Sequence, residues 1–304
     1  MSLAPAHDLQ FKKLALIGCG LMGGSFALAL RAQGCVNEIT GFSASQATRQ
    51  RALALKVIDR ACDSIGQAVE GADLVLLAVP VRATEACLQA LRTTLSPQAL
   101  LMDVGSTKCD VVAAARASLG ERLPCFVPAH PIAGKEVAGI EHAEATLYQQ
   151  RKTILTPLPE TLTGHVQLAR EVWERVGSTV SELSPEAHDA TFAAVSHLPH
   201  LLAFAAINAL LAQPQGHAML QMGGPGFRDF SRIAASAPAV WRDILLMNQQ
   251  EVLAQSRHFR TALAQLENAI ETQDATALEQ LIEQASVARA AWQLNGLSDP
   301  SDAA

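Results

Sequence analysis

Four short segments of the chain carry side chains that could do chemistry. They are DVGSTK at 103–108, HPIAG at 130–134, SHLPH at 196–200 and GFRDFSR at 226–232. A neutral histidine such as His130 can accept a proton near neutral pH. A guanidinium such as that of Arg232 can bind a carboxylate through two parallel hydrogen bonds. The two histidines of SHLPH have no third ligand nearby, so we predict no metal site.

Each segment taken alone also has an ordinary structural interpretation. His130 stands before a proline at the end of a predicted strand and could simply cap a turn. His197 and His200 could be a pair at a helix start, and Arg232 could be a solvated or paired surface arginine. Their function therefore depends on the elements that position them.

The first of these elements is a glycine-rich turn. An apolar strand-like run leads into GCGLMG at 18–23, and a helix-like segment follows. In this context Gly18 allows a tight turn, Gly20 lets the backbone approach a pyrophosphate, and Gly23 lets the helix pack close to the strand. Free N–H groups at the helix start then hold the phosphates. We predict a dinucleotide site here, with contacts from Gly18, Gly20, Leu21, Met22 and Gly23.

The first part of the chain alternates between apolar runs and helix-like segments. We predict strands at 14–17, 38–42, 56–58, 74–80, 100–104, 125–128 and 153–156. Runs that are separated by helices predict a Rossmann-like, doubly wound, mostly parallel α/β sheet. Ligands bind beyond the carboxyl ends of such strands, which places Val79 and the loops after Gly105 and Ala129 around the cofactor.

The pattern changes near residue 184, after which no strand-like run remains. Helical patterns cover 185–213, 237–271 and 275–292, and the glycine–proline segment 223–227 predicts a loop between them. We therefore predict a dinucleotide-binding domain at 1–183 and an all-helical domain at 184–304. The last residues, 295–304, are expected to form a frayed polar tail.

The end of the second predicted strand bears on the choice of cofactor. NAD-binding folds usually carry an acid there, about 20 residues after the glycines, to hold the ribose 2′-hydroxyl. The segment here is GFSAS, which contains no acid. The side chains that could meet a 2′-phosphate instead are Ser43, Ser45 and Thr48, with Arg49 or Arg51 as a source of charge. We favour NADP over NAD, while NAD held by other contacts stays open.

Composition and charge argue against several classes of function. The 304 residues carry a net charge of −6, so there is no basic field for nucleic acid. The six cysteines lie in the first half without a CxxC pair, which suits reduced thiols better than disulfides or a metal cage. The N-terminus shows no signal pattern, and the apolar stretch 198–212 is too short to span a bilayer. We expect a cytoplasmic protein that binds neither nucleic acid nor a membrane.

Five motifs in order along the chain resemble the prephenate/arogenate (cyclohexadienyl) dehydrogenase family of tyrosine biosynthesis. They are the glycine turn, HPIAG, SHLPH, FRDFSRIA and PAVWRD. The resemblance covers nearly the whole chain. It implies oxidative decarboxylation of prephenate or arogenate with hydride transfer from ring C4 to NAD(P)+, giving 4-hydroxyphenylpyruvate or tyrosine. It also implies that the helical domain binds substrate and forms a homodimer.

The resemblance also assigns roles to individual residues. His130 matches the catalytic histidine, and Ser106 matches the serine that orients it near the nicotinamide. Arg232 matches the arginine that binds the ring carboxylate, and His200 matches the histidine that supports it. Two further substrate-binding residues are expected from the same segments, His197 and Glu136. These residues come from both predicted domains, so we expect the site at the cleft between them. No residue distinguishes prephenate from arogenate.

Two other functions stay open. A β-hydroxyacid-type dehydrogenase would share the glycine turn and the helical domain, but it would need a catalytic lysine there, and 184–304 contains no lysine. A non-catalytic NADP-binding sensor would keep the glycine turn without any reason to keep His130, His200 and Arg232 as a set.

Overall fold

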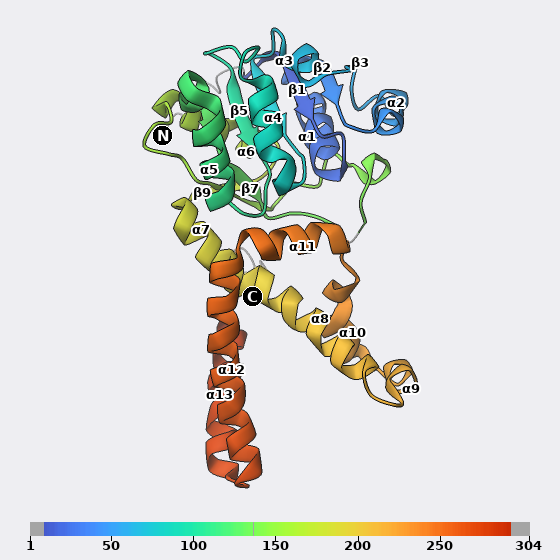
Figure 1. The fold of residues 1–304 in the computed structure, drawn as a ribbon, viewed down its shortest axis with the longest axis vertical. Coiled ribbons are helices and arrows are strands. Elements are labelled where there is room, and N and C mark those ends of the chain that lie inside the picture. The colour runs from blue at the N-terminus through green and yellow to red at the C-terminus, as the bar shows by residue number, and fades with distance from the viewer. Residues whose placement is uncertain (1–8, 136, 293–304) are drawn as a thin grey trace, which may run out of the picture. The chain divides into compact units, whose positions relative to one another are not determined.

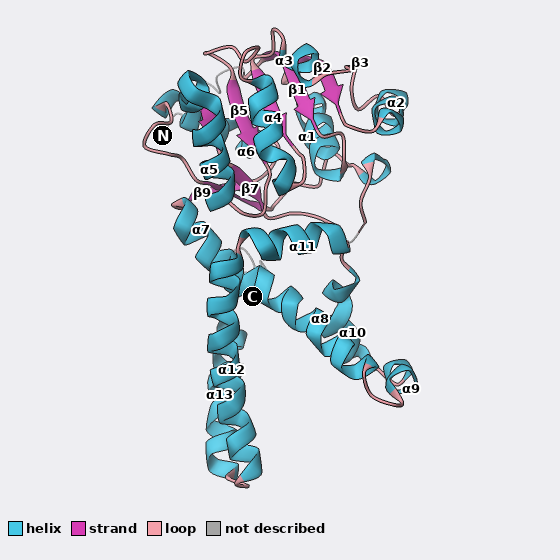
Figure 2. Ribbon diagram, in the orientation of Figure 1, coloured by secondary structure: helices cyan, strands magenta, loops and turns pink. Residues whose placement is uncertain are grey.

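The computed structural model describes residues 9–135 and 137–292 of the chain (Figure 1). The chain forms two compact units, and the boundary between them falls after Gln249. The first unit contains the strands together with many helices, and the described part of the second unit is helical (Figure 2). The domain boundary expected at 183/184 stays a prediction. The tail expected at 295–304 lies outside the described residues.

A parallel sheet of six strands forms the centre of the first unit (Figure 2). Its order is β3-β2-β1-β4-β5-β6, and every neighbouring pair is parallel. The strands are β1 (Phe11–Ile17), β2 (Val36–Phe42), β3 (Arg60–Ala61), β4 (Leu74–Leu77), β5 (Leu100–Asp103) and β6 (Phe126–Val127). This topology confirms the predicted Rossmann-like sheet. The strand order reverses between β1 and β4, which puts the ligand crevice at their carboxyl ends.

Helices cover both faces of this sheet and enclose two apolar cores (Figure 2). Successive side chains of a strand point to opposite faces, so β1 contributes to both cores. One core contains Leu14, Leu16, Phe26 and Trp173, and the other contains Ala15, Ile17, Leu88 and Phe126. The helices are α1 (Leu21–Ala32), α2 (Gln46–Ala54), α3 (Ile65–Val69), α4 (Thr84–Leu91), α5 (Cys109–Leu119) and α6 (Thr163–Arg175). Three short 3-10 turns belong to the same part of the chain. They are η1 (Val81–Ala83) after β4, η2 (Gly120–Cys125) after α5, and η3 (Ile140–His142).

A second sheet consists of three short strands and carries His130. β7 (Ala129–Pro131) pairs antiparallel with β8 (Lys152–Leu155), which pairs parallel with β9 (Thr179–Glu182). The strand predicted at 125–128 is confirmed as β6, although β6 is shorter and ends at Val127. Pro128 separates β6 in the first sheet from β7 in the second, and neither β7 nor β9 was predicted.

The edge strand predicted at 56–58 is wrong, because these residues form a turn and a loop. Lys56 has a φ of +57°, which turns the chain sharply after α2. Val57 and Ile58 are buried in the core as part of a loop, and the edge strand β3 begins only at Arg60. The apolar character of this segment reflects packing rather than strand pairing.

The rest of the first unit is helical. Its helices are α7 (Pro185–Phe192), α8 (Leu198–Leu211), α9 (Gly216–Gln221), α10 (Pro225–Ser231) and α11 (Pro238–Met247), with a 3-10 turn η5 (Arg232–Ala235) before α11. The loop predicted at 223–227 is too long, because α10 already begins at Pro225, a residue well suited to the first turn of a helix. α7 packs on α5 and α11 packs on η1, which ties these helices to the α/β part.

A π-helical turn, η4 (Ala193–His197), joins α7 to α8. Pro199 stands at the start of α8 and has no N–H to donate to the preceding turn, which favours such an irregularity. The continuous helical run is therefore Pro185–Leu211, which is longer than the apolar stretch 198–212 recognised in the sequence. By length and composition alone this run is apolar enough to cross a membrane. One helix of this kind is weak evidence for a membrane span.

The second unit is a helical hairpin over its described residues. α12 (Gln249–Glu271) and α13 (Ala275–Ala291) are joined by a short turn in which Gln273 has a φ of +55° (Figure 1). Asp274 caps α13 by accepting a hydrogen bond from the N–H of Ala277 at 3.0 Å. Both helices expose large apolar side chains, among them Leu253, Ile270, Ile282 and Val287.

Candidate active site

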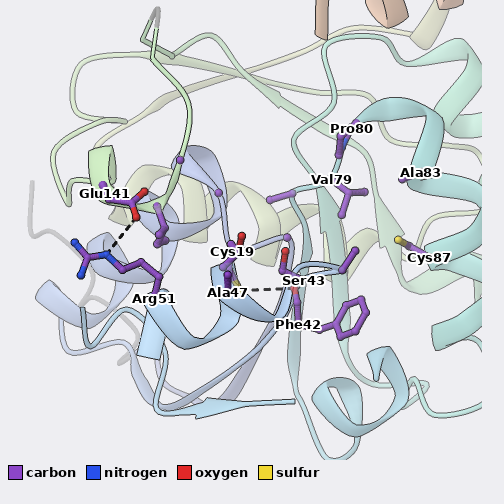
Figure 3. A pocket seen from close by; sticks show the side chains of 17 residues that line it. Cys19, Phe42, Ser43, Ala47, Arg51, Val79, Pro80, Ala83, Cys87 and Glu141 are labelled. Atoms are coloured by element: carbon purple, nitrogen blue, oxygen red, sulfur yellow. Dashed lines mark hydrogen bonds and ion pairs between the residues drawn. The ribbon is translucent and has the colours of Figure 1, made fainter. Parts of the chain in front are cut away.

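A cavity of about 700 Å³ opens at the carboxyl ends of β1, β2 and β4 (Figure 3). It is lined by the glycine turn, the start of α2, the loop after β4 and residues 139–141. Five of the predicted cofactor-binding residues line it: Gly18, Gly20, Ser43, Thr48 and Val79. The sequence predicted that the glycine turn, the segment after β2 and the loop after β4 surround one ligand. In the structure these three elements surround one cavity.

The glycine turn fits a pyrophosphate. Gly18 has a φ of +103°, and a Cβ at this position would overlap the carbonyl group of Ala78. A Cβ on Gly23 would overlap the carbonyl oxygen of Gly18, so α1 packs closely on the turn only because both residues lack side chains. Around Gly20, in contrast, nothing lies within 4 Å of a Cβ. The open space at Gly20, beside the first free N–H groups of α1, suits a phosphate group.

The part of this cavity lined by α2 and η3 contains an ion pair that the sequence did not suggest. Arg51 and Glu141 both line the cavity, and Nε of Arg51 lies 3.2 Å from Oε1 of Glu141 (Figure 3). Each side chain is about half exposed, at 52% and 48%. Although the end of β2 has no acid, a carboxylate from η3, 90 residues away from Arg51 in the sequence, thus lines the cavity.

The other polar side chains near the end of β2 have structural partners. Arg49 donates to the carbonyl oxygen of Ser43 at 2.6 Å and pairs with Asp63 at 3.1 Å. Ser45 caps α2 by accepting a hydrogen bond from the N–H of Thr48 at 3.2 Å. Arg51 is therefore better placed than Arg49 to supply charge to a ligand.

A second cavity of about 400 Å³ lies next to the first and shares Gly20, Val79 and Pro80 with it. Leu21 and Met22 line it from the start of α1, and Ser106 lines it from the loop after β5. α11 supplies its other wall, with the side chains of Val240, Trp241, Asp243 and Ile244. A ligand that extends from the first cavity would place its far end here, beside Ser106.

His130 lies on β7, and its ring is held by a buried chain of hydrogen bonds. Nδ1 of His130 is 2.8 Å from Nε2 of His188, and Nδ1 of His188 is 2.8 Å from Oδ1 of Asp189. The ring of Phe192 packs edge-on against His130 with 4.9 Å between centroids. Burial, followed by the nearby His188, holds the pKa of His130 well below its ordinary value. His130 is therefore neutral at pH 7 and can accept a proton.

The backbone next to His130 is fixed by a buried ion pair between Lys108 and Asp103. Nζ of Lys108 donates to the carbonyl oxygen of Ala129 at 2.9 Å, and the N–H of Ala129 donates to Oδ1 of Asp103 at 2.9 Å. Both polar backbone groups of Ala129 are thus occupied by the same pair. Removing either partner would leave a charge buried without compensation, which is strongly destabilising.

His200 is oriented by an aromatic contact and a backbone contact. Its ring stacks on Trp241 with 3.4 Å between centroids and 19° between planes. Nδ1 of His200 is 2.9 Å from the carbonyl oxygen of Ser196, so Nδ1 carries the hydrogen and Nε2 keeps its lone pair. Burial lowers the pKa of His200.

His197 is the most buried of the predicted substrate-binding residues, at 1% exposure. Its Nδ1 is 3.1 Å from Nδ2 of Asn248, and its ring also makes a hydrogen bond to the backbone of Ser106. Burial lowers the pKa of His197 to about 4. These contacts brace the π-helical turn against the loop that carries Ser106.

The predicted site residues are only partly brought together. Ser106 lines the 400 Å³ cavity, whereas His130, His197, His200 and Arg232 are not among the described residues that line it. Arg232 is exposed at the start of η5, which packs on α8. Glu136 lies outside the described residues. The catalytic and substrate-binding roles of all these residues stay predictions.

Besides Glu141 in the first cavity, the sequence analysis missed three residues around His130 and His197: His188, Asp189 and Asn248. His188 and Asp189 stand in PEAHDATF, which matches no chemical motif, and His130 is 58 residues away. Asn248 donates to the carbonyl oxygen of Asp189 at 2.8 Å and thereby joins the end of α11 to α7. The histidine–aspartate pair at 188–189 was the only signal that the sequence offered.

Comparison with known proteins assigns most of the chain to one family. Residues 26–182 match the family model for the nucleotide-binding domain of prephenate dehydrogenase, and residues 184–284 match the model for its dimerization domain. The cyclohexadienyl dehydrogenase of Zymomonas mobilis is 35% identical over 92% of this chain and 96% of its own length. The prephenate dehydrogenase of Bacillus subtilis is 34% identical over 86% of this chain and 71% of its own length.

Comparison with solved structures finds dehydrogenases of the same kind. A prephenate dehydrogenase from A. aeolicus, in complex with hydroxyphenyl propionate and NAD+, superimposes with a TM-score of 0.87 at 35% identity, over 93% of this chain and 99% of its own. A Synechocystis arogenate dehydrogenase superimposes with a TM-score of 0.78 at 28% identity, over 91% of this chain and 98% of its own. The protein described here belongs to the prephenate dehydrogenase family of NAD(P)-dependent oxidoreductases.

Proposed function

We propose that the protein catalyses the oxidative decarboxylation of prephenate, of arogenate, or of both, with NAD(P)+ as the oxidant. The observation that carries this proposal is the hydrogen-bonded ring of His130 in a chain that is 35% identical, over 93% of its length, to a structure that holds NAD+ and hydroxyphenyl propionate. The nicotinamide, when bound, accepts the hydride from C4 of the substrate ring. The chain supplies binding, orientation and proton transfer.

His130 accepts the proton of the 4-hydroxyl group as the C4–O bond becomes a carbonyl. The ring carboxylate then leaves as carbon dioxide, and its bonding electrons enter the ring. The carbonyl oxygen takes the proton back and becomes the phenol, so His130 ends the cycle neutral. Ser106 lines the 400 Å³ cavity beside the glycine turn, which supports its proposed role in orienting His130 near the nicotinamide.

Arg232 binds the ring carboxylate, and His200 supports this contact with Nε2, the nitrogen that keeps its lone pair. A planar guanidinium suits this task because it offers two parallel donors to a carboxylate. The fixed ring of His200, stacked on Trp241, supports the assignment. His197 acts as a brace behind the site, and Glu136 contacts the substrate side chain or gates the pocket.

NADP+ is the preferred cofactor in this proposal. Ser43 and Thr48 line the first cavity with Arg51, and the end of β2 has no acid to repel a 2′-phosphate. The carboxylate of Glu141 weakens this preference because it pairs with Arg51. NAD+ therefore stays a usable cofactor.

The functional protein is a homodimer. Residues 184–284 match the family's dimerization domain, and α8 and the hairpin of α12 and α13 expose apolar side chains that water does not favour. Size-exclusion chromatography with light scattering is expected to give twice the 32.2 kDa of one chain. The domain boundary at 183/184 and a cytoplasmic location remain part of this proposal.

The function is tested by crossing prephenate and arogenate with NAD+ and NADP+ and following absorbance of the reduced nicotinamide. Reduction with at least one pair is expected, and the fastest pair identifies both preferences. His130→Asn should abolish turnover but leave substrate binding largely intact, whereas Arg232→Ala should mainly weaken substrate binding. If protein that binds the cofactor turns over none of the four pairs, the proposed function is wrong. The β-hydroxyacid-type dehydrogenase or the non-catalytic NADP-binding sensor then replaces it.

A further inference from the structure

The hydrogen-bonded chain behind His130 contains two residues that the reaction above does not use. His188 is fully buried and Asp189 is 3% exposed, and both lie on α7. We propose that Asp189 and His188 position His130 by fixing which of its two ring nitrogens carries the hydrogen. The inference rests on the proposed function, in which His130 is the proton acceptor.

The direction of each hydrogen bond follows from Asp189. An ionised carboxylate can only accept, so His188 donates its Nδ1–H to Oδ1 of Asp189 across 2.8 Å. A neutral His188 then has a lone pair on Nε2, and it accepts the Nδ1–H of His130 across 2.8 Å. A neutral His130 with its hydrogen on Nδ1 has its lone pair on Nε2. That tautomer is the one that can take a proton from a substrate hydroxyl.

Asp189 is held in its ionised form by the start of α5. Its Oδ1 accepts the N–H of Lys108 at 2.8 Å, and its Oδ2 accepts the N–H of Cys109 at 2.9 Å. Burial opposes ionisation, but the hydrogen bonds from His188, Cys109 and Lys108 outweigh it and lower the pKa of Asp189. The positive end of the helix dipole acts in the same direction.

Both histidines of this hydrogen-bonded chain, His130 and His188, are kept neutral. Burial lowers the pKa of His188, and the nearby charge of Lys108 lowers it further, against the opposing effect of Asp189. Burial, His188, Lys108 and His197 all lower the pKa of His130. Phe192 packs on both rings, with centroid distances of 4.9 Å to His130 and 4.5 Å to His188.

The first test measures the tautomers in the unmodified protein. Nitrogen NMR of isotope-labelled histidine rings distinguishes a protonated ring nitrogen from an unprotonated one. At neutral pH, His130 and His188 are both expected to carry hydrogen on Nδ1 and a lone pair on Nε2. The opposite tautomer on either ring overturns the proposal, whether or not any variant folds.

The second test is a double-mutant cycle in kcat. His188→Gln leaves an amide that can still accept the hydrogen bond of His130, but it ends the contact with Asp189. Asp189→Asn keeps an oxygen that can accept the hydrogen bond of His188, but it removes the negative charge. Each is expected to lower kcat by about tenfold to a hundredfold, a part of what a general base contributes, with KM values within about threefold of wild type. Because Asp189 acts through His188, the double variant should be no slower than His188→Gln alone. The exposed His217→Gln is the matched control for loss of one imidazole.

Each outcome decides the proposal separately from the function. A folded His188→Gln with a kcat within about twofold of wild type refutes it, and so do fully additive losses in the double variant. A loss that appears only in KM points to substrate binding and also refutes it. If the unmodified protein turns over no substrate, the proposed function fails, and the tautomers alone decide the arrangement of the chain.

Discussion

Protonation of His197 should destabilise the fold as the pH falls. In the unfolded chain this histidine has its ordinary pKa of 6.5, and in the folded protein burial lowers the pKa to about 4. Below pH 6.5 the unfolded chain therefore binds a proton that the folded protein does not, so acid favours unfolding. The stabilisation is fully present above pH 6.5 and is lost as the pH falls toward 4.

The size of the effect follows from these two values. Between about pH 7.5 and about pH 5, linkage gives a loss of about 2 kcal/mol in the free energy of unfolding from His197 alone. His197→Gln removes this titration and keeps an acceptor for Asn248. The variant should lose about 2 kcal/mol less than wild type over the same pH range.

The measurement is urea unfolding followed by circular dichroism at several pH values and one fixed protein concentration. The quantity compared is the change in unfolding free energy with pH, which cancels any constant cost of the substitution itself. The exposed His217→Gln serves as the control for losing one histidine. Equal pH dependence in His197→Gln and wild type would refute the reasoning, as would an NMR titration that places the pKa of His197 at or above 6.5.

Four further predictions concern variants of residues around the first cavity. Gly20→Ala should leave the melting temperature unchanged, since nothing lies within 4 Å of the added Cβ, but it should weaken cofactor binding measured by calorimetry. Gly18→Ala should lower both, because its φ of +103° and the overlap with Ala78 strain the turn itself. Arg51→Ala should raise the KM for NADP+ about tenfold, the range expected for a charge-assisted hydrogen bond, and change the KM for NAD+ little. Glu141→Gln should lower the KM for NADP+ by freeing Arg51, and equal effects on both cofactors would contradict the proposed preference.

The parts of the fold that depend on short-range pattern could be predicted from the sequence. The glycine turn stands between an apolar strand and a helix, so its function can be inferred from some fifteen neighbouring residues at 11–25. β4 is apolar along its whole length because both of its faces are buried, and that pattern identifies it. These two elements are enough to predict the Rossmann-like sheet and the position of its ligand.

Other parts depend on contacts that no local pattern records. β7 has three residues and contains a proline, and β9 is largely exposed, so neither has the alternating or continuous apolar pattern of a strand. The partner of Arg51 in the cavity, Glu141, is 90 residues away. His188 resembles any buried histidine until the fold places it 2.8 Å from His130.

The start of α5 shows how the helical region is joined to the α/β region beside His130. Lys108 occupies the N-cap position and offers no side-chain cap, so the first N–H groups of α5 need acceptors from elsewhere. Asp189 supplies them, and this contact docks α7 onto α5. The same carboxylate accepts the hydrogen bond of His188, which in turn holds His130. One anion therefore both caps α5 and ends the hydrogen-bonded chain that holds His130. In the mechanism that we propose, a change that loosens the docking of α7 on α5 should also disturb the proton acceptor.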